Sequence, residues 1–216
     1  MGAKARLTAL LTTTDLCCER DSRTLVDGLN LSIEPGHIYQ VEGPNGSGKT
    51  TLLRVLCGIS FRYTGDIHWQ GQPAQKVKTV YHSQLLYLGH SSGVKAALSP
   101  RENLQWHASL KGLQGDEAES AILAALDKVG LYGYEDAACF TLSAGQQRRV
   151  GLARLFLGDA KLWILDEPFT AIDKQGVKEL ESWIADYAAN GGTVILTTHH
   201  ELTIETPINR IRLGEV

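Results

Sequence analysis

Residues 43–50 read Gly43-Pro44-Asn45-Gly46-Ser47-Gly48-Lys49-Thr50, and no other segment of this 216-residue chain is as informative. The octapeptide matches G-x-x-x-x-G-K-[S/T], the pattern of a phosphate-binding loop. A strand predicted over residues 37–41 precedes it and a helix predicted over residues 50–59 follows it. Glycines let backbone N–H groups turn towards a phosphate, and a helix N-terminus adds the positive end of its dipole.

Specific roles follow from this loop. Lys49 can reach the β- and γ-phosphates of a nucleotide, and the hydroxyl of Thr50 can bind Mg²⁺. A glycine-rich turn with a chance lysine is the alternative, and the flanking strand and helix argue against it. We expect nucleotide contacts from the loop and the threonine after it: Gly43, Pro44, Asn45, Gly46, Ser47, Gly48, Lys49, Thr50 and Thr51.

A second candidate segment is the apolar run over residues 162–165, which ends in Asp166 and Glu167. Such a run is typical of a strand buried on both faces, and ligands gather at the carboxyl ends of parallel strands. Asp166 is the candidate ligand of Mg²⁺, and Glu167 is the candidate base that polarises the attacking water. Solvated acids at a strand end are the alternative, which the pairing with the phosphate loop disfavours.

The order of predicted elements indicates an α/β fold. Strands over residues 29–33, 66–69 and 193–197 accompany those above, and helices are predicted over residues 100–131 (interrupted near Gly112 and Gly115), 142–157 and 177–189. Residues 1–14 are interpreted as a frayed extension or a first strand. We expect one domain over residues 1–216: a P-loop NTPase core with a mostly parallel sheet, an N-terminal antiparallel β part, and a helical subdomain inserted at about 91–157.

Composition narrows the possible functions. The net charge of -3 and the absence of a basic patch give no reason to expect nucleic acid. Cys17, Cys18, Cys57 and Cys139 show no C-x-x-C spacing, so reduced thiols are expected. No apolar run approaches the roughly 18 residues needed to span a bilayer, so another subunit would provide any membrane path.

Residues 142–146 read Leu-Ser-Ala-Gly-Gln, at the start of a predicted helix. They resemble the L-S-G-G-Q signature of the ATP-binding cassettes of ABC transporters, with Ala144 in place of the first glycine. The resemblance implies an ABC ATPase that hydrolyses ATP with Mg²⁺. It also implies that Ser143, Gly145 and Gln146 contact the γ-phosphate bound to a second cassette, so that two chains pair head to tail around two ATP molecules.

Further matches extend the resemblance over residues 8–213. The segment 170–173 resembles the D-loop, and residues 99–104 resemble the segment after the Q-loop. His199 is implied to be the switch histidine that contacts the γ-phosphate. His90 stands where the family has its Q-loop glutamine; it is a candidate site residue, with simple packing in a loop as the alternative.

The aromatic residue that stacks on adenine in this family has no counterpart in the segment around Arg20. A guanidinium plane can stack on a base, so Arg20 is the candidate contact. A solvated charged loop is the alternative.

Several longer runs resemble one branch of the family, the ATP-binding subunits of haem exporters in cytochrome c maturation; examples are residues 142–150, 163–173 and 194–199. The branch implies ATP-driven release of a haem-loaded chaperone and a homodimer of cassettes. Its expected partners are an integral-membrane subunit (CcmB-like) and associated cytochrome c maturation proteins. The expected location is peripheral, on the cytoplasmic face of the bacterial inner membrane. Another ABC exporter, or a soluble ABC ATPase acting on protein or nucleic acid, is the alternative.

Overall fold

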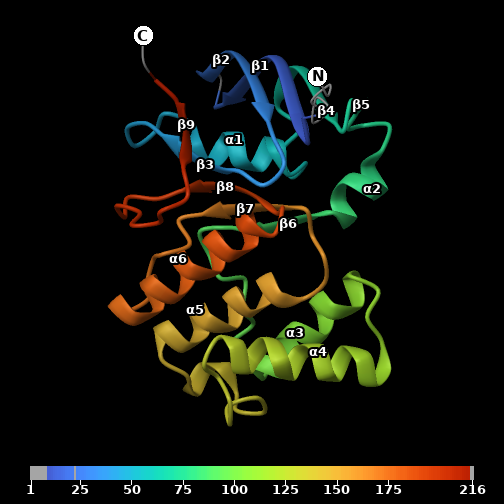
Figure 1. Ribbon diagram of the computed structural model, residues 1–216, viewed down its shortest axis with the longest axis vertical. Helices are drawn as coiled ribbons and strands as arrows, with labels where there is room; N and C mark the ends of the chain where they lie inside the picture. Colours follow the sequence, from blue (N-terminus) through green and yellow to red (C-terminus); the bar gives the residue numbers. More distant parts are fainter. Residues whose placement is uncertain (1–8, 22, 215–216) are drawn as a thin grey trace, which may run out of the picture. The chain divides into compact units, whose positions relative to one another are not determined.

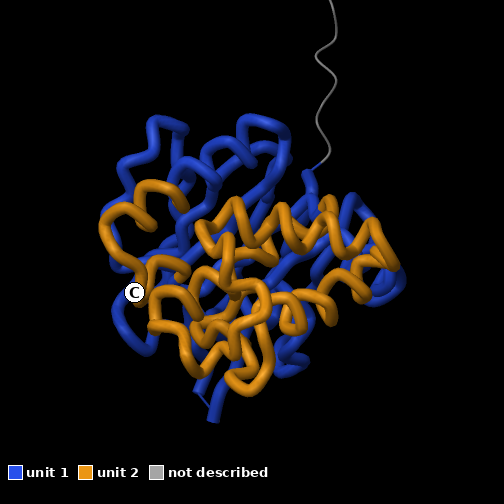
Figure 2. The backbone as a smooth tube through the Cα atoms, turned by 90° about the horizontal axis from the view of Figure 1, so that it is seen from below, with its two compact units in different colours: residues 1–87, 160–167, 181–216 blue, residues 88–159, 168–180 orange. Residues whose placement is uncertain are grey.

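The computed structural model describes residues 9–21 and 23–214, which form two compact units. Unit 1 comprises residues 1–87, 160–167 and 181–216, and unit 2 comprises residues 88–159 and 168–180 (Figure 2). Each unit has its own buried apolar residues, so each is described by itself.

Unit 1 contains an antiparallel sheet near the N-terminus (Figure 1). Its strands are β1 (Leu11–Arg20), β2 (Arg23–Ile33), β4 (Tyr63–Trp69) and β5 (Gln72–Pro73), in the order β2-β1-β4-β5. The predicted N-terminal antiparallel part is therefore confirmed, and β1 and β2 are longer than the sequence indicated. Residues 1–8, at the start of the predicted extension, lie outside the described residues.

The second sheet of unit 1 has the order β6-β7-β8-β3-β9. Its strands are β6 (Leu85–Leu88), β7 (Leu162–Asp166), β8 (Thr193–Thr197), β3 (Ile38–Glu42) and β9 (Ile208–Arg212). β8 pairs in parallel with β7 and β3, and β3 pairs in parallel with β9, as the fold class requires. All five residues of β7 and of β8 are buried, which explains their nearly continuous apolar sequences.

Helix α1 (Lys49–Leu56) lies between the two sheets (Figure 1). Its buried leucines share one apolar core with residues of β1, β3, β7 and β8. The helix predicted to reach residue 59 ends at Leu56, so that prediction was three residues too long. Gly58 is the cause, because its φ of 71° breaks the helix while the N–H of Ile59 donates back to the carbonyl of Arg54.

Helix α6 (Lys174–Ala189) begins three residues before the predicted start. Its Tyr187 ring stacks on Trp163 of β7, with centroids 3.6 Å apart and planes 2° apart. The Tyr187 hydroxyl also donates to the carbonyl of Ala160 at 2.5 Å. A Cβ on Gly192 would lie 2.4 Å from this ring, so the turn after α6 requires glycine there. The short helix α2 (Lys78–Ser83) was not predicted.

Unit 2 is mainly helical, with α3 (Pro100–Leu110), α4 (Gly115–Lys128) and α5 (Ala144–Ala153). Short 3-10 turns occur at Cys139–Thr141 and Arg154–Phe156, so the helix predicted over residues 142–157 ends earlier than expected. Ser99 caps α3, and Glu102 completes the reciprocal pair of hydrogen bonds. Gly112, at φ 84°, ends α3 where the interruption was predicted.

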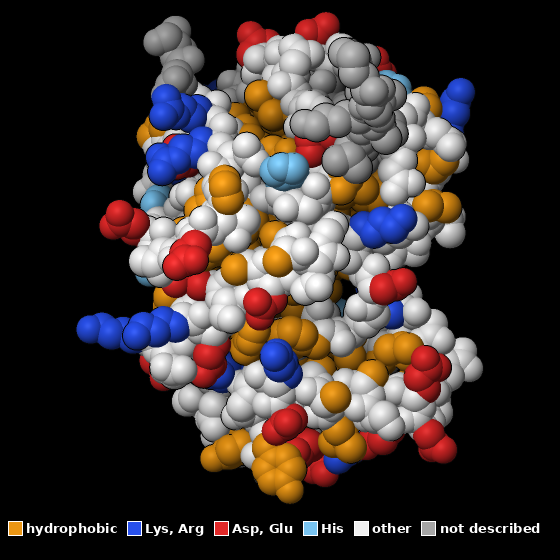
Figure 3. Space-filling view, in the orientation of Figure 1, with side chains coloured by type: hydrophobic (Ala, Val, Ile, Leu, Met, Phe, Trp, Pro, Cys, Tyr) orange, Lys and Arg blue, Asp and Glu red, His pale blue; other side chains and the backbone are white. Residues whose placement is uncertain are grey.

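Three further features concern the surface charges, the cysteines and the length of the helices. Basic and acidic side chains are interspersed on the face drawn in Figure 3. All four cysteines are free. Within residues 9–21 and 23–214, the structure has no helix that is both long and apolar enough to cross a membrane.

Candidate functional site

The phosphate loop connects β3 to α1, and its backbone conformation depends on glycine. Gly43, Gly46 and Gly48 have φ values of 149°, 86° and 97°. A Cβ on Gly48 would lie 2.8 Å from the Cβ of Leu25, whereas a Cβ on Gly46 would meet nothing within 4 Å. The loop backbone therefore packs against Leu25 at Gly48, whereas at Gly46 it has open space beside it. Such an open backbone suits the binding of a phosphate.

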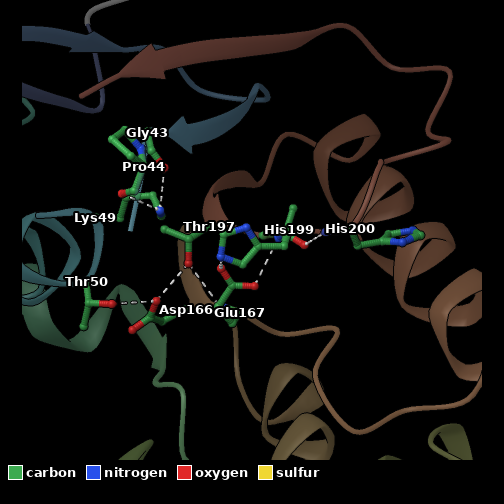
Figure 4. Close-up of polar contacts among 10 residues, drawn as sticks. Gly43, Pro44, Lys49, Thr50, Asp166, Glu167, Thr197, His199 and His200 are labelled. Atoms are coloured by element: carbon green, nitrogen blue, oxygen red, sulfur yellow. Dashed lines mark hydrogen bonds and ion pairs between the residues drawn. The ribbon is translucent and has the colours of Figure 1, made fainter. Parts of the chain in front are cut away.

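Lys49 turns back over the loop (Figure 4). Its ammonium donates to the carbonyls of Gly43 at 2.7 Å and Pro44 at 3.2 Å. Among the described residues, the buried Oγ of Ser47 has no hydrogen-bond partner. An unpaired hydroxyl and a nearby ammonium give the loop polar groups for an anionic ligand.

Asp166 ends β7 beside the start of α1, because β7 and β3 belong to the same parallel sheet. Its Oδ1 accepts from the hydroxyls of Thr50 at 3.2 Å and Thr197 at 2.8 Å. Its Oδ2 is buried without a hydrogen-bond partner in the part of the chain that the structure describes. A buried carboxylate oxygen beside a threonine hydroxyl fits Mg²⁺, which binds such oxygen ligands.

Glu167 follows the carboxyl end of β7 and has a left-handed backbone conformation, with φ 51°. Its N–H donates to the hydroxyl of Thr197 at 3.0 Å, which helps hold this uncommon backbone. Its Oε2 accepts from the N–H of His199 at 3.2 Å, and its Oε1 lies 3.6 Å from His199 Nε2 (Figure 4). The structure thus brings together two of the three predicted catalytic side chains, Glu167 and His199.

Thr197 is a site residue that the sequence analysis missed. It joins the two acids, because its hydroxyl donates to Asp166 while accepting from the backbone of Glu167. The register of the sheet pairs Asp166 with Thr197 directly. Its place at the end of a β-rich run, next to the candidate His199, was the available signal.

Cys57 follows the C-terminus of α1, the helix end that is remote from the phosphate loop. Burial raises its pKa to about 12, and the charge of Asp166 adds to the effect. The thiol therefore stays protonated at neutral pH.

The predicted signature residues lie in unit 2. Ser143 caps α5: its hydroxyl accepts from the N–H of Gln146 at 3.2 Å, and its own N–H donates to the Gln146 side chain at 2.9 Å. A Cβ on Gly145 would lie 3.5 Å from the carbonyl of Ala171. The signature is thus a capped helix N-terminus, a form suited to binding an anion. Contact with a second chain stays a prediction.

Two further candidates are His90, which belongs to unit 2, and Arg20, which has no recorded contact with Asp166 within unit 1. His90 is exposed in unit 2, and its carbonyl accepts from Arg148 at 3.3 Å. Arg20 is exposed at the end of β1, and its Nε lies 3.5 Å from Oδ2 of Asp21. Arg20 lines a cavity of about 410 Å³ together with Phe61, an aromatic ring that the local sequence around Arg20 could not reveal. Both roles remain predictions.

Comparison with known proteins gives a consistent result. The profile of the ABC transporter family matches residues 26–170, which include the phosphate loop and the acidic strand end. The chain is 50% identical over 210 residues to "Cytochrome c biogenesis ATP-binding export protein CcmA" from Hahella chejuensis, covering 97% of this chain and 98% of that protein. A protein of the same name from Aliivibrio fischeri is 50% identical over 202 residues, covering 93% and 98%.

The solved structures agree. A protein described as an ABC transporter ATP-binding protein from Pyrococcus furiosus superposes with a TM-score of 0.79 at 28% identity, covering 94% of this chain and 96% of that one.

Proposed function

Because the chain belongs to the ABC transporter family, we propose that its ATP hydrolysis drives an export complex of c-type cytochrome biogenesis. Family membership makes the chain an ATP hydrolase that converts ATP and water to ADP and phosphate. The observation that carries the specific role is the 50% identity, over nearly the full length of both chains, to proteins named for that process. The work done is the release of a haem-loaded chaperone or the export of haem.

The phosphate loop binds ATP in this proposal. Backbone N–H groups of residues 43–51, other than Pro44, and the ammonium of Lys49 hold the phosphates, so Lys49 exchanges its loop carbonyls for phosphate oxygens. Thr50 and Asp166 would hold Mg²⁺, which when bound neutralises negative charge on the phosphate oxygens. The unpaired Oδ2 of Asp166 supports that assignment.

Glu167 is the base in this mechanism. Its side chain is 18% exposed, so solvent reaches part of it. His199 Nε2 lies 3.6 Å from its Oε1. Glu167 polarises the attacking water, and His199 contacts the γ-phosphate. The two hydrogen bonds at Thr197 keep Glu167 and Asp166 in fixed relation while charge develops.

The remaining predicted contacts complete the proposed cycle. Ser143, Gly145 and Gln146 contact the γ-phosphate on the second cassette of a head-to-tail homodimer, and ATP closes that dimer. His90 takes the place of the Q-loop glutamine, and Arg20 stacks on adenine. Residues 91–157 act as the inserted helical subdomain.

The proposed partners follow from the biogenesis role. They are the integral-membrane subunit of the haem-exporter complex and associated cytochrome c maturation proteins. The chain binds the cytoplasmic face of the bacterial inner membrane through that subunit, without nucleic acid.

The enzymatic test compares Glu167→Gln with the unaltered protein in a steady-state ATPase assay. Loss of a general base reduces turnover by about 10²–10⁴-fold, while the neutral amide leaves ATP binding intact. Lys49→Ala is expected to weaken nucleotide binding as well. Glu201→Gln, which alters an exposed carboxylate just after the switch histidine, serves as the matched control. Normal turnover by Glu167→Gln would overturn the assignment of the base.

The biological test is a pull-down of tagged Glu167→Gln protein from its native membranes in the presence of Mg-ATP. We expect an integral-membrane partner together with cytochrome-assembly components. Recovery of only a soluble protein or nucleic acid would contradict the export role and leave the ATPase assignment standing.

A further inference from the structure

Glu181 is a buried carboxylate outside the nucleotide site. It lies on α6, is 7% exposed, and accepts three hydrogen bonds. Thr203 gives two of them, from its N–H to Oε1 at 2.8 Å and from its hydroxyl to Oε2 at 2.6 Å. The third comes from Nε2 of His200, at 3.2 Å from Oε1. One side chain therefore holds two points of the segment that follows β8.

That segment, residues 198–203, has no regular secondary structure, yet it carries the switch histidine. At its start, the N–H of His199 donates to Glu167 at 3.2 Å. The N–H of His200 donates to the hydroxyl of Thr198 at 2.8 Å. Farther along the segment, Glu181 holds His200 and Thr203 through the three hydrogen bonds described above. Glu181, His200 and Thr203 thus form a bracket at the end of the segment that carries His199.

The contacts of the bracket favour the charged form of Glu181. Burial alone would raise the pKa of Glu181, but the hydrogen bonds from Thr203 and His200 outweigh it and hold the pKa below its ordinary value. Glu181 is therefore ionised at neutral pH. A buried anion is costly unless its oxygens accept hydrogen bonds. The charge of Glu181 therefore favours the conformation of the segment in which His200 and Thr203 donate to it.

We propose that Glu181 is a positioning residue for ATP hydrolysis, which fixes His199 beside Glu167 by binding His200 and Thr203. It acts through the segment and not on the reacting atoms. The inference rests on the roles proposed above for Glu167 and His199. It adds a residue that neither the nucleotide motifs nor the family match assigns to the reaction.

The test uses two substitutions that preserve shape. Glu181→Gln removes the charge, and Thr203→Val removes one donor while leaving the backbone N–H. Small displacements of a catalytic group cost between about tenfold and a hundredfold in rate. We expect a loss of that size in kcat with little change in KM, because the phosphate loop is untouched. Asp186→Asn, an exposed carboxylate on the same helix, is the matched control.

A double-mutant cycle separates positioning from general destabilisation. If Glu181 acts through His199, Glu181→Gln causes no further loss of kcat in a His199→Ala background. Thermal unfolding and titration with an ATP analogue verify that each variant is folded and binds nucleotide. Unchanged kcat in folded Glu181→Gln, or losses that multiply fully with those of His199→Ala, would overturn the proposal. Failure of the ATPase mechanism itself would appear separately, as normal turnover by Glu167→Gln.

Discussion

Two glycines of the phosphate loop share an unusual backbone conformation but differ in their surroundings. Gly46 and Gly48 have φ values of 86° and 97°, a region that side chains disfavour by roughly 1–2 kcal/mol. Only Gly48 also faces a fixed atom, because the Cβ of Leu25 lies 2.8 Å from the position that a new Cβ would take. Conformation and packing can therefore be separated by experiment.

We expect Gly48→Ala to lower the free energy of unfolding by about 1–3 kcal/mol more than Gly46→Ala does. Both variants pay the cost of positive φ, and Gly48→Ala must also move β2 away from the loop. Urea denaturation without nucleotide measures the difference, and Gly46→Ala is the internal control. Equal losses in the two variants would show that the contact with Leu25 yields freely.

The site residues that could be predicted from sequence are those whose roles depend on local spacing. Lys49 and Thr50 follow the loop within one motif, and Asp166 and Glu167 end one apolar run. Thr197 and Glu181 were missed, because their roles depend on the register of β7 with β8 and on the packing of α6. No short pattern contains that information.

At the level of elements, the start of α3 was predicted more accurately than the end of α1. The start of α3 at Pro100 agrees with the predicted start at residue 100, where a capping Ser99 and an N-terminal proline are local signals. The end of α1 was missed, because Gly58 was not recognised as a terminating residue with positive φ. The strands of the antiparallel sheet were underestimated for a related reason: pairing partners determine their lengths.

Helix α3 carries a histidine that makes unit 2 sensitive to acid. Burial, with a further effect of the charge on Arg154, lowers the pKa of His107 to about 4. An unfolded histidine has a pKa of about 6.5, so between these values the unfolded chain binds more protons than the folded one. The contribution of His107 to folding stability is therefore fully present above about pH 6.5 and is lost as the pH is lowered towards 4.

We expect His107→Gln to flatten that part of the pH dependence, because it removes the group that must take up a proton on unfolding. Urea denaturation at pH 7 and pH 5 measures the effect. His37→Gln, which alters an exposed histidine, should leave the slope unchanged. A slope equal in His107→Gln and the unaltered protein would assign the acid sensitivity to other groups.

At the level of the whole molecule, the nucleotide groups are divided between the two units. The phosphate loop, Asp166, Glu167 and His199 belong to unit 1, whereas the capped signature at Ser143 belongs to unit 2. In the proposed head-to-tail arrangement, each ATP takes its loop from one chain and its signature from the other. The phosphate loop and the signature of one chain would then bind two different ATP molecules.

We expect Glu167→Gln with Mg-ATP to have twice the 23.6 kDa mass of one chain, measured by light scattering after size-exclusion chromatography. Without hydrolysis, the nucleotide that joins the chains stays in place. A second change, Ser143→Arg, should restore the single-chain mass by placing a bulky side chain at the predicted interface. A single-chain mass for Glu167→Gln at saturating Mg-ATP would contradict the proposed pairing.

The stacked rings of Trp163 and Tyr187 give this enzyme an optical property of its own. Trp163 is 4% exposed and sits on the strand that ends at Asp166, with Tyr187 of α6 covering its face. Indole emission shifts to longer wavelength when water reaches the ring. Any sliding of α6 along β7 during turnover would uncover that ring, so the emission wavelength of Trp163, in a variant that lacks the other three tryptophans, would report the motion without an added dye.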